Sequence, residues 1–253
     1  MKPAKSGWLG TNLPHQLMPS PNVNIRNGDQ KISILLLHYT GMITAAKACH
    51  WLCAKESEVS CHYLVDEQGE LTQMVDEKMR AWHAGIGSWH GQEDVNSRSI
   101  GIEIHNPGHT HGYVDFPKVQ MVAVASLCKD IMSRHNISAR GVLAHSDIAP
   151  QRKIDPGERF DWKFLHSQSV GHWVKPEPIS GGSFLQEGDQ GDAVLALQSL
   201  LKLYGYGIQL TGIYDETTRQ TIKAFQRHFR QVKVDGVADA STVATLHNLL
   251  RTA

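Results

Sequence analysis

Two kinds of hydrophobic pattern divide the chain. In the first two thirds, short apolar runs occupy residues 32–37, 100–104 and 141–144, and each has the length of a buried β-strand. Apolar side chains also recur four residues apart, at Val119, Ala123, Leu127 and Ile131. This spacing predicts a helix over residues 119–134. Strands combined with helices in this way predict an α/β domain.

Apolar side chains at helical spacing form three stripes in the last third of the chain: Val194, Leu197 and Leu201; Ile222, Phe225 and Phe229; Val243, Leu246 and Leu250. They predict a small all-α domain of three helices. The spacing of a glycine, an aspartate and a threonine at residues 212–218 recurs at residues 236–242. Asp215 and Asp239 are expected to cap the N-termini of two of these helices.

Residues 174–183 contain the prolines and glycines typical of a linker between domains. We therefore expect an extended N-terminal arm over residues 1–30, a first domain over 31–173 and a helical domain over 184–253. Such a linker predicts that a cut after Trp173 leaves the first domain folded.

Composition excludes several function classes. The 253 residues are 41% hydrophobic, which suits compact domains, and 25 acidic residues balance 25 basic ones. Zero net charge argues against a nucleic-acid partner bound through phosphate contacts. No apolar run is long enough to span a membrane, and residues 1–10 lack the apolar run of a secretory signal. The four cysteines, Cys49, Cys53, Cys61 and Cys128, lack paired spacing and are expected to be free.

Three residues have metal-binding chemistry, and two of them follow or end apolar runs. His145 follows the run at 141–144, Asp155 lies just before a Pro-Gly turn, and His38 ends the run at 32–37. Two imidazoles and a carboxylate, with a fourth position left to water, are the ligands expected of catalytic zinc. The alternative is that each histidine is a hydrogen-bonded residue at a strand end.

Residues 99–105 alternate, so that Gly101, Glu103 and His105 share one face of a strand. A carboxylate on a core strand needs a partner or a task. Glu103 is thus either a structural acid paired with an arginine or lysine, or a general base that activates water. His105, His109 and His111 lie in or beside a Pro-Gly turn, which favours a solvated loop over a second metal site.

Several motifs together resemble the zinc-dependent N-acetylmuramoyl-L-alanine amidases, a superfamily that includes phage amidase-type lysozymes and peptidoglycan recognition proteins. The motifs are Leu36–Thr40, Arg80–Gly85, Asn96 with Ile100–Glu103, His145–Asp147 and Lys153–Gly157. The resemblance covers about residues 20–165 and implies a mixed central β-sheet flanked by helices. The pattern over residues 184–250 is similar to a peptidoglycan-binding domain.

The resemblance assigns roles to residues. It implies that His38, His145 and Asp155 hold one Zn²⁺ per catalytic domain, that Glu103 is the general base, and that Lys153 steadies the anionic oxygen of the reacting carbonyl. Relatives with a catalytic tyrosine place it where this chain has Cys61. A thiol is no simple substitute for a tyrosine, so the base role is expected to fall on Glu103.

Four further residues in these motifs are candidates for substrate binding. Trp82 and His83 would stack on a sugar or flank the cleft, although an aromatic residue beside Ala-Gly is also typical of packing. Arg80 would hold a peptide carboxylate in a bidentate pair, and Asn96 lies in the same group of motifs.

The function implied is hydrolysis of the amide between the lactyl group of N-acetylmuramic acid and L-alanine, in peptidoglycan or in anhydromuropeptides. The alternatives are a non-catalytic peptidoglycan recognition protein and a zinc peptidase on the same scaffold. A recognition protein would lack one of the ligands or the base, whereas this chain has all of them. The similarity to a wall-binding domain favours the periplasm or cell envelope, and the lack of a recognisable signal in this sequence leaves the cytoplasm as the alternative. The sequence gives no oligomeric state.

Overall fold

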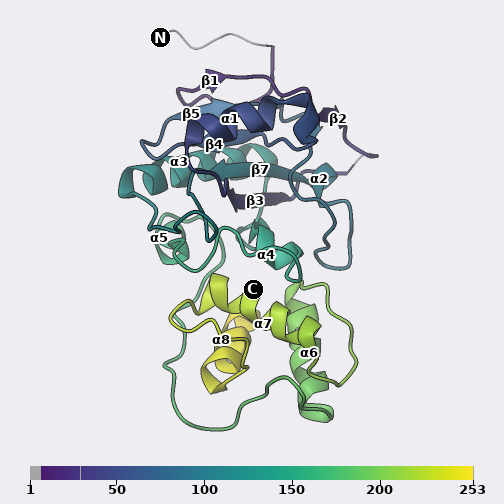
Figure 1. The fold of residues 1–253 in the computed structure, drawn as a ribbon. Helices are drawn as coiled ribbons and strands as arrows, with labels where there is room; N and C mark the ends of the chain where they lie inside the picture. Colours follow the sequence, from purple (N-terminus) through teal and green to yellow (C-terminus); the bar gives the residue numbers. More distant parts are fainter. Residues whose placement is uncertain (1–6, 29, 253) are drawn as a thin grey trace.

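The computed structural model describes residues 7–28 and 30–252. Its central feature is a six-stranded sheet with the strand order β1-β5-β4-β7-β3-β8 (Figure 1). The strands are β1 (Gln16–Leu17), β5 (Leu71–Gln73), β4 (Tyr63–Val65), β7 (Ser99–Ile104), β3 (Ile34–Tyr39) and β8 (Val142–Ala144). Strands β4, β7, β3 and β8 are parallel, and β5 is antiparallel to β4. The mixed central sheet expected from the sequence is therefore confirmed.

Strand β3 extends two residues beyond the predicted run, and His38 lies within it. The cause is continued pairing with β7, since His38 stands opposite Glu103 and Tyr39 opposite Ile104. Alternate residues of β3 enter two different cores. Leu35 and Leu37 pack beneath α3, whereas Ile34 and Leu36 face the side that carries His38.

Helix α3 (Lys118–His135) confirms the predicted helix but not the whole predicted stripe. Leu127 and Ile131 are buried, whereas Val119 is 55% exposed. A spacing of four residues advances slightly more than one turn, so such a stripe drifts around the helix over several turns. Met121 and Val124 occupy the buried face in place of the first predicted positions.

The shorter elements complete the first domain. They are β2 (Val23–Ile25), paired with β6 (Met79–Ala81), and the helices α1 (Ala45–Cys53), η1 (Lys55–Ser57), α2 (Val95–Arg98), η2 (Ala139–Gly141), α4 (His145–Ile148) and α5 (Trp162–Ser167). The described part of the expected arm, residues 7–28, supplies β1 and β2 and so joins both sheets; residues 1–6 and 29 lie outside the described residues. All four cysteines are free, two of them buried and two half-buried. Within the described ranges, no helix has the length and apolar character needed to cross a membrane.

The C-terminal helices are α6 (Asp192–Tyr204), α7 (Glu216–Phe229) and α8 (Ala240–Arg251). The predicted caps are confirmed, because Asp215 accepts a hydrogen bond from the Thr218 amide and Asp239 accepts one from the Thr242 amide, both at 2.8 Å. The predicted apolar stripes form the core of the helical domain, with Leu249 buried more fully than Leu250.

The helical domain packs directly against the first domain, below it in Figure 1, with α4 at the junction. One hydrophobic cluster contains residues of both, including Ile34 and Leu36 of β3 and Val194 of α6. Trp89 packs edge-on against Tyr206, with ring centroids 5.2 Å apart. Residues 174–184 form no helix or strand. The domain boundaries at residues 173 and 184 remain a prediction. The shared cluster implies that a cut after Trp173 would expose apolar surface of the first domain.

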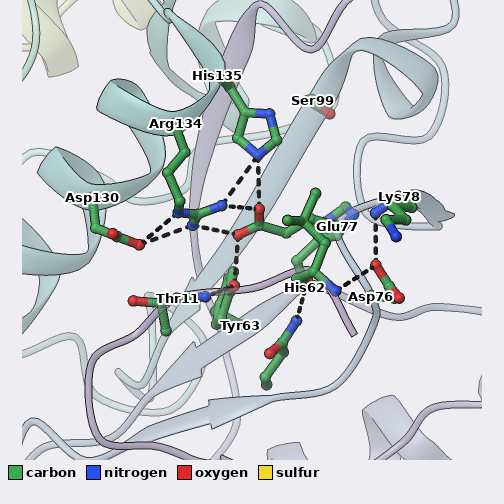
Figure 2. Close-up of polar contacts among 12 residues, drawn as sticks. Thr11, His62, Tyr63, Asp76, Glu77, Lys78, Ser99, Asp130, Arg134 and His135 are labelled. Atoms are coloured by element: carbon green, nitrogen blue, oxygen red, sulfur yellow. Dashed lines mark hydrogen bonds and ion pairs between the residues drawn. The ribbon is translucent and has the colours of Figure 1, made fainter. Parts of the chain in front are cut away.

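A buried carboxylate in the first domain links β4 to α3 (Figure 2). Glu77 is fully buried and accepts hydrogen bonds from Tyr63, Arg134 and His135. Burial raises the pKa of a carboxyl group, but here the hydrogen bonds outweigh it and lower the pKa of Glu77 to about 2. The carboxylate therefore stabilises the folded state at neutral pH.

We expect Glu77→Gln to lower the free energy of unfolding by about 3 kcal/mol, because the substitution leaves Arg134 without its buried counter-charge. Urea denaturation at pH 7 measures this loss. Glu216→Gln is the matched control, since its carboxylate also binds an arginine, Arg219, but is 53% exposed on α7. Glu216→Gln is expected to lower the free energy of unfolding by much less than Glu77→Gln.

The difference between Glu77→Gln and the wild-type protein should also depend on pH. The folded-state pKa lies near 2, below the ordinary value of 4.5, so the contribution is complete above that ordinary value. It shrinks as the pH falls through the folded-state pKa. A difference that stayed constant down to pH 2 would show that the charge of Glu77 is not what stabilises the fold.

Candidate active site

The candidate ligands meet at the carboxyl ends of three parallel strands, where α/β sheets commonly place their sites. His38 lies near the end of β3, opposite Glu103 on β7. His145 follows β8 directly, as the first residue of α4. Asp155 comes from the loop after α4, and the Ser146 amide donates to its carbonyl oxygen at 3.0 Å. Neighbouring strands thus deliver side chains that are distant in sequence to one point.

Hydrogen bonds fix which nitrogen of His38 carries its proton. The Ser99 hydroxyl donates its only hydrogen to the Val95 carbonyl oxygen at 2.7 Å, so it accepts from His83 Nε2 at 3.2 Å. Burial lowers the pKa of His83 well below its usual value, so the ring is neutral and its Nδ1 is an acceptor. His38 then donates from Nε2 to His83 Nδ1 at 3.0 Å. The Nδ1 atom of His38 is left with a free lone pair.

The ring of His145 is oriented by a different hydrogen bond. Its Nε2 lies 3.0 Å from the carbonyl oxygen of Ala84, which accepts hydrogen bonds and cannot donate them. In a neutral ring, Nδ1 of His145 is therefore also an acceptor. Burial and the neighbouring His145 lower the pKa of His38 to about 4, which keeps that ring neutral at pH 7.

Three acceptor atoms consequently face one another. The Nδ1 atoms of His38 and His145 are 2.9 Å apart, and Asp155 Oδ2 lies 3.2 Å and 3.0 Å from them. Three acceptors this close repel one another unless a cation lies between them.

The donor set fits zinc. Bonds of 2.0–2.1 Å in a tetrahedral site place neighbouring ligand atoms roughly 3.3 Å apart, close to the separations found here. All three residues are buried, and they form the one such group of potential ligands within the part of the chain that the structure describes. His109 and His111 are exposed and join no second group.

Glu103 lies beside this group with an unused oxygen. Its Oε2 is buried and has no hydrogen-bond partner among the described residues. Burial and the charge of Asp155 raise the pKa of Glu103 well above its usual value, with Lys153 opposing the shift. No arginine or lysine pairs with it in the described part of the chain, which removes support for the alternative of a paired structural acid.

One cleft of about 240 Å³ contains most of the predicted residues. Its polar side is formed by His38, Glu103, His145, Lys153 and Asp155, together with His83. The cleft is also lined by the apolar side chains of Met42, Ala48, Trp51, Leu52, Val59 and Trp82. Cys61 lies under Glu103 and is fully buried, and burial raises the pKa of its thiol well above the usual value. A neutral buried thiol is unsuited to act as the base.

The four candidates for substrate contact have different surroundings. Arg80 donates to Asp94 at 2.8 Å, and Asn96 accepts from the His83 and Ala84 amides at 3.0 Å and 2.8 Å. Neither lines the cleft that holds the ligands. Trp82 does line it, while its indole nitrogen donates to Asn24 at 2.8 Å.

Sequence reasoning missed the residues that support the ligands. Ser99 orients His83, which accepts a hydrogen bond from His38, and the carbonyl oxygen of Ala84 accepts one from His145. A serine hydroxyl and a backbone carbonyl group carry no signal in the sequence that would mark them for this role. Gly101 is required beside His83, because a Cβ there would come within 2.5 Å of the ring. The sequence predicts that Gly101 and Glu103 share one face of a strand. It does not show that His83 packs so closely there that only a glycine fits.

The fold and the site combine an α/β sheet with a buried group of potential metal ligands, and comparison with known proteins shows the family. The family model for N-acetylmuramoyl-L-alanine amidase matches residues 28–158, and the model for a putative peptidoglycan-binding domain matches residues 190–246. The chain belongs to the N-acetylmuramoyl-L-alanine amidase family.

Individual relatives match different shares of the chain. The N-acetylmuramoyl-L-alanine amidase AmiD of Escherichia coli K12 is 35% identical, over 87% of this chain and 83% of its own length. The 1,6-anhydro-N-acetylmuramyl-L-alanine amidase AmpD of Citrobacter freundii is 33% identical, over 62% of this chain and 89% of its own. Among solved structures, AmiD in complex with its substrate matches with a TM-score of 0.76 and 34% identity, covering 90% of this chain and 92% of its own. The structure of AmpDh3 from Pseudomonas aeruginosa matches with a TM-score of 0.72 and 27% sequence identity, covering 90% of this chain and 95% of its own.

We expect His83→Leu to weaken zinc binding by 10- to 100-fold, because it removes the acceptor for the His38 Nε2 hydrogen that orients the ligand. Competition with a chelator measures the affinity. His172→Leu is the matched control, since His172 is another buried histidine and bonds to Tyr204 and Thr252. Equal zinc affinity in the two variants would contradict the supporting role of His83.

Proposed function

We propose that this protein is a zinc-dependent amidase that cleaves the bond between the lactyl group of N-acetylmuramic acid and L-alanine. The buried group formed by His38, His145 and Asp155 carries the proposal, because its two imidazoles and one carboxylate match the ligand set of catalytic zinc at the separations that such a site requires. The adjacent unpartnered oxygen of Glu103 adds a base where a hydrolase needs one.

The ligands bound in structures of two relatives support anhydromuropeptides as the substrates of this protein. The AmiD structure contains anhydro-N-acetylmuramic acid-L-Ala-D-γ-Glu-L-Lys, and one AmpDh3 structure contains an anhydromuramic pentapeptide. The cleft of this chain suits such a ligand, since its lining combines polar residues with the aromatic side chains of Trp51 and Trp82. Aromatic faces of this kind pack well against sugar rings.

The residues of the chain divide the chemistry between them. Zinc, when bound by His38, His145 and Asp155, supplies a Lewis acid that activates water and polarises a carbonyl group. Glu103 accepts a proton from the attacking water at Oε2 and returns it to the nitrogen of L-alanine as the amide breaks. Lys153 stabilises the carbonyl oxygen as it becomes anionic.

The second domain supports a role at the cell wall. Its match to a peptidoglycan-binding model indicates a module that holds the enzyme near polymeric substrate, which raises local concentration without altering the chemistry. We place the protein in the periplasm or cell envelope on this ground. A recognition protein without activity is disfavoured, because the complete set of ligands and the base is present.

Glu103→Gln should retain zinc and lose turnover by about 10² to 10⁴-fold, roughly 3 to 5 kcal/mol of barrier. Mass spectrometry of anhydromuropeptide digests measures the products, which should be intact stem peptide and anhydro-sugar. His145→Ala is the comparison variant and should lose both zinc and activity. A Glu103→Gln enzyme with nearly wild-type kcat would exclude this residue as the base, and release of free amino acids would favour a peptidase.

Wall binding by the second domain is tested in the full-length Glu103→Gln protein, which does not consume its substrate. We expect it to sediment with insoluble sacculi and to stay in the pellet when excess soluble anhydromuropeptide fills the catalytic cleft. Release of the protein by the soluble ligand would show that the cleft alone binds the wall. That outcome would overturn the binding role of residues 184–253 while leaving the amidase intact.

A further inference from the structure

A second buried carboxylate lies at the junction of the two domains. Asp147 is fully buried on α4, two residues after the ligand His145. Its Oδ1 accepts a hydrogen bond from the Tyr206 hydroxyl at 2.8 Å, and its Oδ2 accepts one from His228 Nδ1 at 2.7 Å. Both donors belong to the C-terminal helical domain. The motif containing Asp147 was visible in the sequence, but nothing in the proposed chemistry uses this residue.

The same carboxylate holds the backbone that precedes the ligand. Asp147 Oδ2 also accepts from the Ala144 amide at 2.8 Å, at the turn where β8 becomes α4. His145 is the next residue, so this bond fixes the direction in which its side chain leaves the backbone. The position of Asp147 and that of His145 are therefore linked through one turn of chain.

The two donors from the helical domain are themselves held rigidly. The His228 ring stacks between Trp162 of the first domain and Phe229, with centroids 3.6 Å and 3.8 Å away. Tyr206 is 1% exposed and packs against Trp89. A buried carboxylate is strongly unfavourable without hydrogen-bond donors, so removal of either donor displaces Asp147 or admits water beside it.

We propose that the helical domain supports the metal centre, with Tyr206 and His228 acting as positioning residues for the zinc ligand His145 through Asp147. The inference rests on the proposed zinc amidase function and extends it. The helical domain then has a second task besides wall binding: its docking sets the zinc affinity and the turnover of even a small soluble substrate.

Two neighbouring tyrosines provide the test. Tyr206→Phe removes the hydroxyl that reaches Asp147. Tyr204→Phe removes an equally buried hydroxyl at the same junction, but one that bonds to His172 at 2.9 Å. In the full-length protein we expect Tyr206→Phe to bind zinc about 10-fold more weakly by chelator competition, in line with the loss of an outer-shell partner. Tyr204→Phe should keep the wild-type zinc affinity.

Two further readouts separate positioning from general stability. Tyr206→Phe should lower kcat on soluble anhydromuropeptide more than it raises KM, and it should shift the visible spectrum of the cobalt-substituted enzyme. Asp147→Asn, which keeps the shape of the side chain, should shift that spectrum in the same direction. Thermal unfolding measures the loss of stability in both tyrosine variants. The zinc affinity of Tyr206→Phe should fall by more than a similar loss of stability causes in Tyr204→Phe.

The outcomes are distinct. If the two tyrosine variants bind zinc alike, whether both weakly or both tightly, the junction is only structural and the inference is overturned. A wild-type protein that bound no zinc would instead defeat the proposed function itself. Weaker zinc binding and a shifted cobalt spectrum confined to Tyr206→Phe and Asp147→Asn would support the coupling.

Discussion

The structure depends on holding three hydrogen-bond acceptors against one another. His38, His145 and Asp155 place two nitrogens and one oxygen within 3.2 Å of each other, an arrangement that repels in the absence of a cation. Such a group persists only when the surrounding fold over-determines it. Much of the first domain can be understood as that surrounding fold, because each of the three residues has its own backbone anchor and each histidine also has an outer hydrogen bond, from His38 to His83 and from His145 to Ala84.

The parallel sheet supplies the first of these constraints. Pairing of β3 with β7 fixes His38 beside Glu103, and apolar side chains on both faces of β3 prevent the strand from sliding. A slip of one residue would turn His38 into the core beneath α3 and move Leu37 into the cleft. Register is thus both a folding constraint and a condition for the metal site.

The strands could be predicted from the sequence and the three ligands could be proposed from it, because both follow local rules. His38 and His145 stand at or near the ends of apolar runs, and Glu103 interrupts one with a period of two. The domain contacts obey no local rule: Tyr206 and His228 lie 59 and 81 residues from Asp147, and a linker composition gives no information on whether the domains it joins are docked. For the same reason, the sequence could not distinguish His83 as a support for His38 from His83 as a contact to a sugar.

The covalent connection between the domains favours docking of the helical domain. A linker of residues 174–183 keeps the domain close to its partner surface, so docking is intramolecular and proceeds at a high effective concentration. Modest contacts then suffice, namely one shared apolar cluster and the hydrogen bonds to Asp147. Because those hydrogen bonds reach the turn that carries His145, any force that separated the domains, including strain from binding a cross-linked wall, would act first on a zinc ligand. The position of Asp147 therefore makes the state of the domain junction a determinant of the metal site.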